Sequence, residues 1–175
     1  MGASIGSTLA SRGVTVTTCL DGRSLETRAR AQQSHMKDVG SLDDFIATSD
    51  LVLSVLVPSE ALSFAETIAG SIRRTAAHPT FVDCNAVAPR TMSHIATLIA
   101  DAGASVVDAC ILGPPMKPGA DTRFYCAGPQ TGDFESLGDY GIPIRRISNL
   151  IGQASALKMA YATSTKVTTA LWIQL

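Results

Sequence analysis

The chain has 175 residues, enough for one domain with a sizeable core, and carries a net charge of −1. Hydrophobic residues make up 46% and charged residues 17%, as in ordinary globular proteins, and no basic cluster indicates a nucleic-acid partner. The longest apolar runs are of strand length and no signal-peptide pattern opens the chain, so we expect a cytoplasmic protein without a membrane span.

Helical and strand patterns alternate along the chain. Helices are indicated by apolar residues three or four apart and by capping residues such as Ser24, and strands by β-branched or continuous apolar runs. In chain order the predicted elements are a helix over 3–11, a strand over 14–20, helices over 24–33 and 41–47, a strand over 51–56, a helix over 58–72, a strand over 80–83, a helix over 89–102, strands over 105–109 and 123–127, a helical turn near 134–137, a strand over 143–147 and a long helix from 152 to 175. This alternation is typical of the α/β class, here a Rossmann-type doubly wound parallel sheet with helices on both faces.

The pattern also predicts how the chain is divided. Residues 1–150 form the predicted dinucleotide-binding domain, and residues 151–175 begin a C-terminal all-α domain. A Rossmann unit opens with an apolar strand and a glycine-rich turn, whereas this sequence opens on a helix. We therefore expect a fragment that lacks the first strand and most of the helical domain.

The cysteines are spaced too widely to form a metal or disulfide motif. Three of the four fall in or at the ends of predicted strands, and none forms a C-x-x-C pair: Cys19, Cys84, Cys110 and Cys126. We expect them to be small core residues in a reducing compartment, with no metal site.

Polar and small residues follow several predicted strands, where ligands of open α/β sheets bind. After the strand over 14–20 come Asp21, Arg23 and Ser24, and an acid there would hold the adenine ribose while an arginine would hold the 2′-phosphate of NADP. A simple turn before a helix explains these residues equally well. Asn85, after the strand over 80–83, has an amide able to hold a carboxamide or ribose hydroxyl, or alternatively to cap the next helix.

Taken together, five segments resemble the 6-phosphogluconate and 3-hydroxyisobutyrate (β-hydroxyacid) dehydrogenase superfamily. They are Met1–Gly6, Asp21–Ser24, the strand ends Leu53–Pro58 and Phe81–Pro89, Val107–Pro115, and Gly152–Lys158. The resemblance implies that Gly2 is the third glycine of the phosphate-binding turn, where a missing Cβ lets helix and sheet approach. It also implies that Leu56, Val57 and Asn85 lie along the nicotinamide half of the cofactor.

The same resemblance implies the reactive end of the site. Gly113 lies in the segment that binds substrate in that family, and Lys158 matches its catalytic lysine, a partly desolvated amine able to act as acid or base. Three positions depart from the family: Leu112 stands where a serine holds the substrate, Pro114 where that motif has its last glycine, and Ala162 where an asparagine follows the lysine. A glycine–proline turn and a solvated surface lysine are the alternatives for these segments.

The prediction is therefore an NAD(P)-dependent oxidoreductase that acts on a hydroxyacid. We expect NADP as cofactor, with NAD possible, a small-molecule hydroxyacid substrate, neither nucleic acid nor membrane as partner, and a homodimer for the full-length parent. The alternative is a truncated or degenerate NADP-binding domain without activity. A Rossmann methyltransferase is disfavoured by the proline after the strand over 51–56 and by the Lys158 segment.

Overall fold

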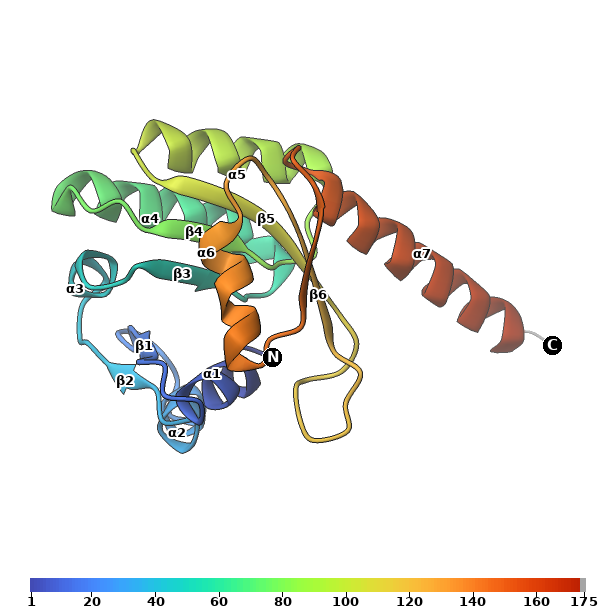
Figure 1. Cartoon of the computed structure of the whole chain (residues 1–175), viewed down its shortest axis with the longest axis horizontal. Helices are drawn as coiled ribbons and strands as arrows, with labels where there is room; N and C mark the ends of the chain where they lie inside the picture. The colour runs from blue at the N-terminus through green and yellow to red at the C-terminus, as the bar shows by residue number, and fades with distance from the viewer. Residues whose placement is uncertain (174–175) are drawn as a thin grey trace.

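The computed structural model describes residues 1–173, which build an α/β fold around a five-stranded sheet (Figure 1). The strands are β3 (Leu51–Ser54), β4 (Thr80–Asp83), β5 (Ser105–Leu112), β6 (Arg123–Ala127) and β7 (Ile144–Ser148), adjacent in that order. All neighbours run parallel except β5 and β6, which are antiparallel. The predicted α/β class is thus confirmed, with a sheet that is predominantly parallel.

A second, two-stranded parallel sheet consists of β1 (Thr17–Thr18) and β2 (Lys37–Asp38). It is not hydrogen-bonded to β3, so the single sheet of the prediction is divided in two. In the strand order of a Rossmann sheet, one further strand lies between the positions of β1 and β3.

Helices cover both faces of the larger sheet (Figure 1). They are α1 (Gly2–Ala10), α2 (Leu25–Gln33), α3 (Leu42–Ala47), α4 (Ala61–Thr75), α5 (Pro89–Asp101), α6 (Gly132–Glu135) and α7 (Gln153–Ile173), with 3₁₀ turns η1 (Pro58–Glu60) before α4 and η2 (Ser136–Tyr140) after α6. Ser24 and Ser41 cap α2 and α3 as predicted, each accepting a hydrogen bond from a backbone N–H three residues on.

The core has two layers because neighbouring strand residues point to opposite faces. Phe81 and Val106 pack with α4 and α5, whereas Val82 and Val107 pack with α1 and α6. Three of the four cysteines are buried in or beside these layers, and all four are free thiols. Burial raises the pKa of Cys110 to about 12 and that of Cys126 to about 11, so these thiols stay protonated at neutral pH.

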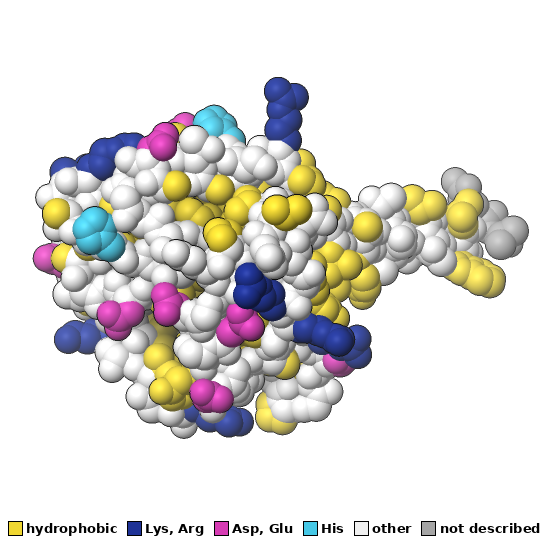
Figure 2. Space-filling view, turned by 45° about the horizontal axis from the view of Figure 1, so that its top comes forward, with side chains coloured by type: hydrophobic (Ala, Val, Ile, Leu, Met, Phe, Trp, Pro, Cys, Tyr) yellow, Lys and Arg dark blue, Asp and Glu magenta, His cyan; other side chains and the backbone are white. Residues whose placement is uncertain are grey.

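Helix α7 begins against the sheet and then projects away from the body of the molecule (Figure 1). Ala154 and Ser155 in its first turn are fully buried. Further along, apolar side chains are exposed and visible as a patch on the projecting helix (Figure 2), including Val167, Leu171 and Trp172. Within residues 1–173 no helix has the length and apolar character needed to cross a bilayer. The last two residues of the predicted helix, 174 and 175, lie outside the described residues.

Candidate functional site

The side chain of Asn85 joins the carboxyl ends of β3 and β4. Its Oδ1 accepts a hydrogen bond from the Leu56 N–H at 2.6 Å, and its Nδ2 donates to Ser54 Oγ at 2.8 Å and to Asp83 Oδ2 at 3.0 Å. Only 2% of the residue is exposed. Asn85 does not cap α5, whose N-cap is Ala88 without a side-chain hydrogen bond. Its main role in the structure is therefore to hold the Leu56 backbone at the sheet edge.

Beneath this contact lies a pair of buried carboxyl groups on neighbouring strands. Asp83 on β4 is in register with Asp108 on β5, and neither is exposed. Burial raises the pKa of Asp83 above its ordinary value of 3.8, and hydrogen bonds from Asn85 oppose this rise. Burial likewise raises the pKa of Asp108, against the hydrogen bonds donated by Ser155 and its neighbours. No hydrogen bond between the two carboxyl groups occurs within the described residues, and the charge of Asp108 adds to the rise in the pKa of Asp83.

Asp108 holds the start of α7. Its Oδ2 accepts the backbone N–H groups of Gly152 at 2.8 Å and Ala154 at 2.9 Å, and its Oδ1 accepts the Ser155 hydroxyl at 2.7 Å and the Ser155 N–H at 3.1 Å. A carboxylate at this place satisfies donors that a helix leaves free in its first turn and also faces the positive end of the helix dipole. The register of α7 against β5 is thereby fixed.

Lys158 lies one turn further along α7 and reaches back to the end of β5. Its Nζ donates a hydrogen bond to the Ile111 carbonyl at 2.7 Å, and the residue is half-buried. Leu112, at the family's serine position, is partly buried and packs, like Leu157, against the small cluster of Cys110, Ala127 and Ala154. The amine thus lies near the carboxyl end of β5, the middle strand of the larger sheet, with Leu112 and not a serine beside it.

The glycines of α1 differ in how closely they approach their neighbours. A Cβ added to Gly2 would lie 3.8 Å from the Val55 Cβ, an ordinary contact, whereas one added to Gly6 would lie 2.8 Å from Met36 Sδ. The close approach expected at Gly2 therefore occurs at Gly6, against the Met36 side chain in the segment between α2 and β2. Gly2 does lie beside β3, just before Leu56.

The turn after β1 carries the predicted adenine-ribose residues. Asp21 and Arg23 are exposed, and no ion pair of Arg23 occurs among the described residues. Ser24 Oγ accepts the Thr27 N–H at 3.3 Å and caps α2, so it has a structural role already. The Arg28 guanidinium donates to the Arg23 carbonyl and lies 4.0 Å from Asp38.

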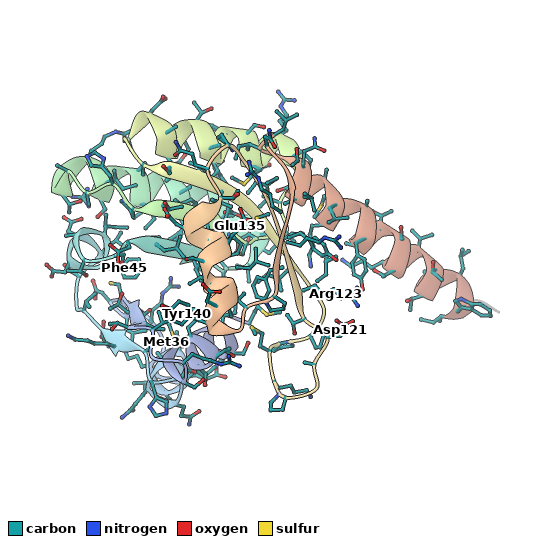
Figure 3. All side chains as sticks on the ribbon, in the orientation of Figure 1. Met36, Phe45, Asp121, Arg123, Glu135 and Tyr140 are labelled. Carbon is teal, nitrogen blue, oxygen red and sulfur yellow. The ribbon has the colours of Figure 1, made fainter. Side chains whose placement is uncertain are left out.

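Gly113 is required by the shape of the loop between β5 and β6. Its φ is +107°, and an added Cβ would overlap the Asp121 carbonyl oxygen. Thr122 Oγ1 closes the same loop by donating to the Pro114 carbonyl at 2.8 Å, and Arg123 pairs with Asp121 at its end (Figure 3). The need for a glycine here is thus explained by the turn itself.

The predicted residues fall into two groups. Gly2, Leu56, Val57 and Asn85 lie by the carboxyl ends of β3 and β4, and Gly113 and Lys158 lie at the end of β5. Asp21, Arg23 and Ser24 lie instead in the turn between β1, of the separate two-stranded sheet, and α2. An open groove of about 700 Å³ lies between α1 and the β5–β6 loop, close to Gly2 and Gly113 in sequence, although none of the predicted residues lines it.

Sequence reasoning missed the two acids that organise this edge. The only local signal for Asp108 is an acidic residue within the apolar run Val106–Cys110, which implies a buried and therefore partnered carboxylate. Its partner Ser155 lies 47 positions away and has no sequence signal of its own.

Comparison with known proteins identifies relatives of the chain. A protein of 28.5 kDa from the 7S RNA 5′ region of Methanothermus fervidus, itself uncharacterised, is 29% identical over 161 residues, which are 92% of this chain and 60% of that protein. A conserved protein of unknown function, described as structurally similar to 3-hydroxyacid dehydrogenases, superposes with a TM-score of 0.84 at 33% identity, covering 99% of this chain and 64% of that one.

A reductive aminase from Aspergillus terreus, solved in complex with NADPH and ethyl-5-oxohexanoate, shares the fold with a TM-score of 0.78 at 17% identity, over 99% of this chain and 60% of the aminase. The chain therefore spans about three fifths of the length of these relatives. The sequence profile described as the NAD binding domain of 6-phosphogluconate dehydrogenase matches residues 1–139. Because that match covers most of the chain, the protein belongs to the family of 6-phosphogluconate dehydrogenase NAD-binding domains.

Proposed function

We propose that the chain binds a nicotinamide dinucleotide along the carboxyl ends of its strands, as part of an NAD(P)-dependent dehydrogenase of small hydroxyacids with Lys158 as acid–base group. One observation carries the proposal: the Lys158 amine is held on the Ile111 carbonyl at the end of β5, by a helix whose start is fixed by Asp108. A lone surface lysine would not need such a fixed helix.

The chain's residues fit a cofactor at both ends. Arg23 is exposed without an ion pair in the described residues, so its five N–H donors are free for the 2′-phosphate of NADP. At the other end, Val57 is 62% exposed beside Leu56, an apolar surface suited to a nicotinamide ring. Asp21 in the same turn as Arg23 would accept a ribose hydroxyl of NAD, and we propose NADP as the preferred form because the free guanidinium is the stronger anion partner.

A bound nicotinamide would supply the carbon that exchanges hydride with the substrate. Lys158 would take the proton of the substrate hydroxyl, and the Ile111 carbonyl would orient the amine through its hydrogen bond. Gly113 begins the loop directly after β5 and would offer its backbone N–H to the substrate. Asn85 and Asp108 would act indirectly, by holding the Leu56 backbone and α7 in place.

A second candidate is an NADP-binding domain without catalysis. It is favoured by Leu112, which cannot donate a hydrogen bond where the resembling enzymes have a serine, and by Ala162 in place of asparagine. Both candidate functions include NADP binding, so the difference between them is whether the protein turns over a substrate with Lys158 as acid–base group.

Cofactor titration tests the proposal. The fluorescence of NADPH, and separately of NADH, is followed during titration with the wild-type protein, with Arg23→Gln and with the matched control Arg73→Gln. The control substitution removes an exposed arginine of α4. We expect Arg23→Gln to weaken NADPH binding about tenfold or more, the value of a charge-assisted phosphate contact, and to change NADH binding little. If neither NADPH nor NADH binds to the complete protein, both candidate functions are refuted.

Lys158→Met in the complete protein then separates the two candidates. We expect NADPH affinity to stay within about threefold of wild type while oxidation of hydroxyacids is lost. Turnover that survives the substitution would refute the acid–base role, and wild-type inactivity on every hydroxyacid tried would favour the second candidate.

The complete protein is further proposed to be a homodimer, supported by the exposed apolar side chains of α7, among them Leu171 and Trp172. Sedimentation as a monomer at micromolar concentration would contradict this.

A further inference from the structure

The hydrogen bonds around the buried Asn85 amide are complete only while Asp83 is ionised. The two N–H donors of the amide point at Ser54 Oγ and Asp83 Oδ2, and its oxygen accepts the Leu56 N–H. The other carboxylate oxygen, Asp83 Oδ1, accepts the backbone N–H of Asn85 at 2.8 Å. An ionised carboxylate only accepts hydrogen bonds, which is the role that both of its oxygens have here. A proton on Oδ2 would face the Nδ2 group, donor against donor.

A protonated Asp83 fits the opposite orientation of the same amide. The proton goes to Oδ2, because Oδ1 faces a backbone N–H that cannot turn. Turning the Asn85 amide by half a revolution exchanges its oxygen and nitrogen, which are of nearly equal size, so the turn requires no extra room in this buried place. The amide oxygen would then accept from the carboxyl O–H of Asp83 and from the Ser54 hydroxyl, which rotates to donate.

The turned amide releases the backbone of Leu56. The Leu56 N–H, which donates to Oδ1 in the structure, would then face an amide nitrogen that cannot accept. Leu56 is half-buried and the neighbouring Val57 is 62% exposed, so the released N–H can reach solvent or a bound ligand. The protonation of one buried acid is thereby connected to a backbone donor at the carboxyl edge of the sheet.

The groups that face Asp83 favour proton uptake there. Burial raises the pKa of Asp83 above its ordinary value of 3.8, and the charge of Asp108, in register on β5, adds to the rise. The thiols of Cys84 and Cys110 stay protonated because burial raises their pKa values, and no Lys or Arg forms an ion pair with either acid within residues 1–173. Four donors of residues 152–155 stabilise the ionised form of Asp108, against the two that Asn85 gives Asp83, so Asp83 takes the proton first.

We propose that Asp83, Asn85 and Leu56 form a proton-operated switch at the carboxyl edge of the sheet. With Asp83 ionised, Asn85 holds the Leu56 N–H and fixes this stretch of backbone. With Asp83 protonated, the amide turns and the N–H is released. The consequence for the cofactor rests on the proposed function: NADP binds the fixed edge more tightly than the released edge, so proton uptake and cofactor binding oppose each other.

Nuclear magnetic resonance of the complete protein without cofactor tests the switch. We expect one titration, centred above pH 3.8, to appear together in the Asp83 carboxyl carbon, the Asn85 side-chain NH₂ and the Leu56 N–H. The exchange protection of Leu56 should fall about fivefold as Asp83 is protonated, the value of one lost hydrogen bond. Asp83→Asn, whose amide donates as the protonated acid does, should show the low protection already at neutral pH. Asp139→Asn, at an exposed acid of η2, is the control and should keep the wild-type midpoint.

Three results would overturn the switch. They are a titration of Asp83 that leaves Asn85 and Leu56 unchanged, the absence of an Asp83 titration before the protein unfolds, and Leu56 protection in Asp83→Asn equal to that of wild type at neutral pH. The wild-type titration alone decides the matter should Asp83→Asn fail to fold.

The affinity for NADP⁺ over the same pH range separates the switch from the proposed function. The ratio of wild-type to Asp83→Asn affinity is free of the titration of the cofactor's own phosphates. We expect this ratio to be about fivefold at neutral pH and to approach one below the midpoint. A coupled titration of Asn85 and Leu56 in a protein that binds no NADP⁺ would refute the proposed function and leave the switch. Binding of NADP⁺ with a ratio that stays constant would refute the link between the switch and the cofactor.

Discussion

Replacing Asp108 should loosen α7 and with it the position of Lys158. Asp108→Ala would leave the N–H groups of Gly152, Ala154 and Ser155 and the Ser155 hydroxyl without their acceptor in a buried place. Loss of a helix cap costs about 1 kcal/mol, and each further unsatisfied buried donor adds about 1–3 kcal/mol, so we expect a loss of at least about 4 kcal/mol in the free energy of unfolding. For a domain of ordinary stability, about 5–15 kcal/mol, this is a large fraction.

The loss of unfolding free energy is measured by urea unfolding, monitored by far-ultraviolet circular dichroism. Asp108→Asn keeps one acceptor oxygen and should lose about half as much unfolding free energy as Asp108→Ala. Asp139→Asn, at an exposed acid of η2, is the control and should stay within about 0.5 kcal/mol of wild type. Amide exchange adds a local readout, since Ala154 and Ser155 should exchange faster in Asp108→Asn than in wild type. An Asp108→Ala variant as stable as Asp139→Asn, with α7 equally protected, would refute the reasoning.

Three further outcomes follow from the same contacts. Gly113→Ala should destabilise the protein by about 1–3 kcal/mol, because a Cβ there meets the Asp121 carbonyl at a φ of +107°; an unchanged urea midpoint would contradict this. Gly6→Ala should cost about 1 kcal/mol or less, because the added Cβ meets the flexible Met36 side chain, and a second substitution, Met36→Ala, should remove most of the clash in a double-mutant cycle. Asp83 binds its proton more tightly in the folded than in the unfolded chain, so the free energy of unfolding should decline as pH rises from 3.8 through the higher pKa of the folded state. Asp83→Asn should flatten that decline, and an identical dependence of unfolding free energy on pH in both proteins would contradict the prediction.

Elements with a clear hydrophobic pattern were predictable from the sequence. The strands β4 and β6 have the predicted bounds, and α5 ends within a residue of its prediction, because apolar runs and a proline at the first helical turn are local signals. The strand β5 extends to Leu112, beyond the predicted end at 109, because β6 pairs with it along that length. Pairing with a later strand leaves no mark in the local sequence.

The two-stranded sheet of β1 and β2 was poorly predicted. Only Thr17 and Thr18 of the expected strand over 14–20 are hydrogen-bonded as a strand, and the partner Lys37–Asp38 is polar and exposed, so nothing in its composition indicated a strand. Its strand character comes from pairing with β1 and not from burial.

The candidate site was likewise predictable only in part. Lys158 and the strand ends could be placed from spacing and resemblance, because the carboxyl ends of parallel strands share one edge. The contacts that hold them could not, because Asn85 reaches a backbone N–H 29 positions away and Asp108 reaches a helix 44 to 47 positions away. Such pairings depend on the three-dimensional arrangement of strands that the sequence order alone does not specify.

Amide chemical shifts during a titration of the isotope-labelled complete protein with NADPH test the central claim most directly. The account predicts shifts at Gly2, at the turn of Arg23, at Leu56 and Asn85, and at Lys158. Shifts absent from all of these positions would contradict it.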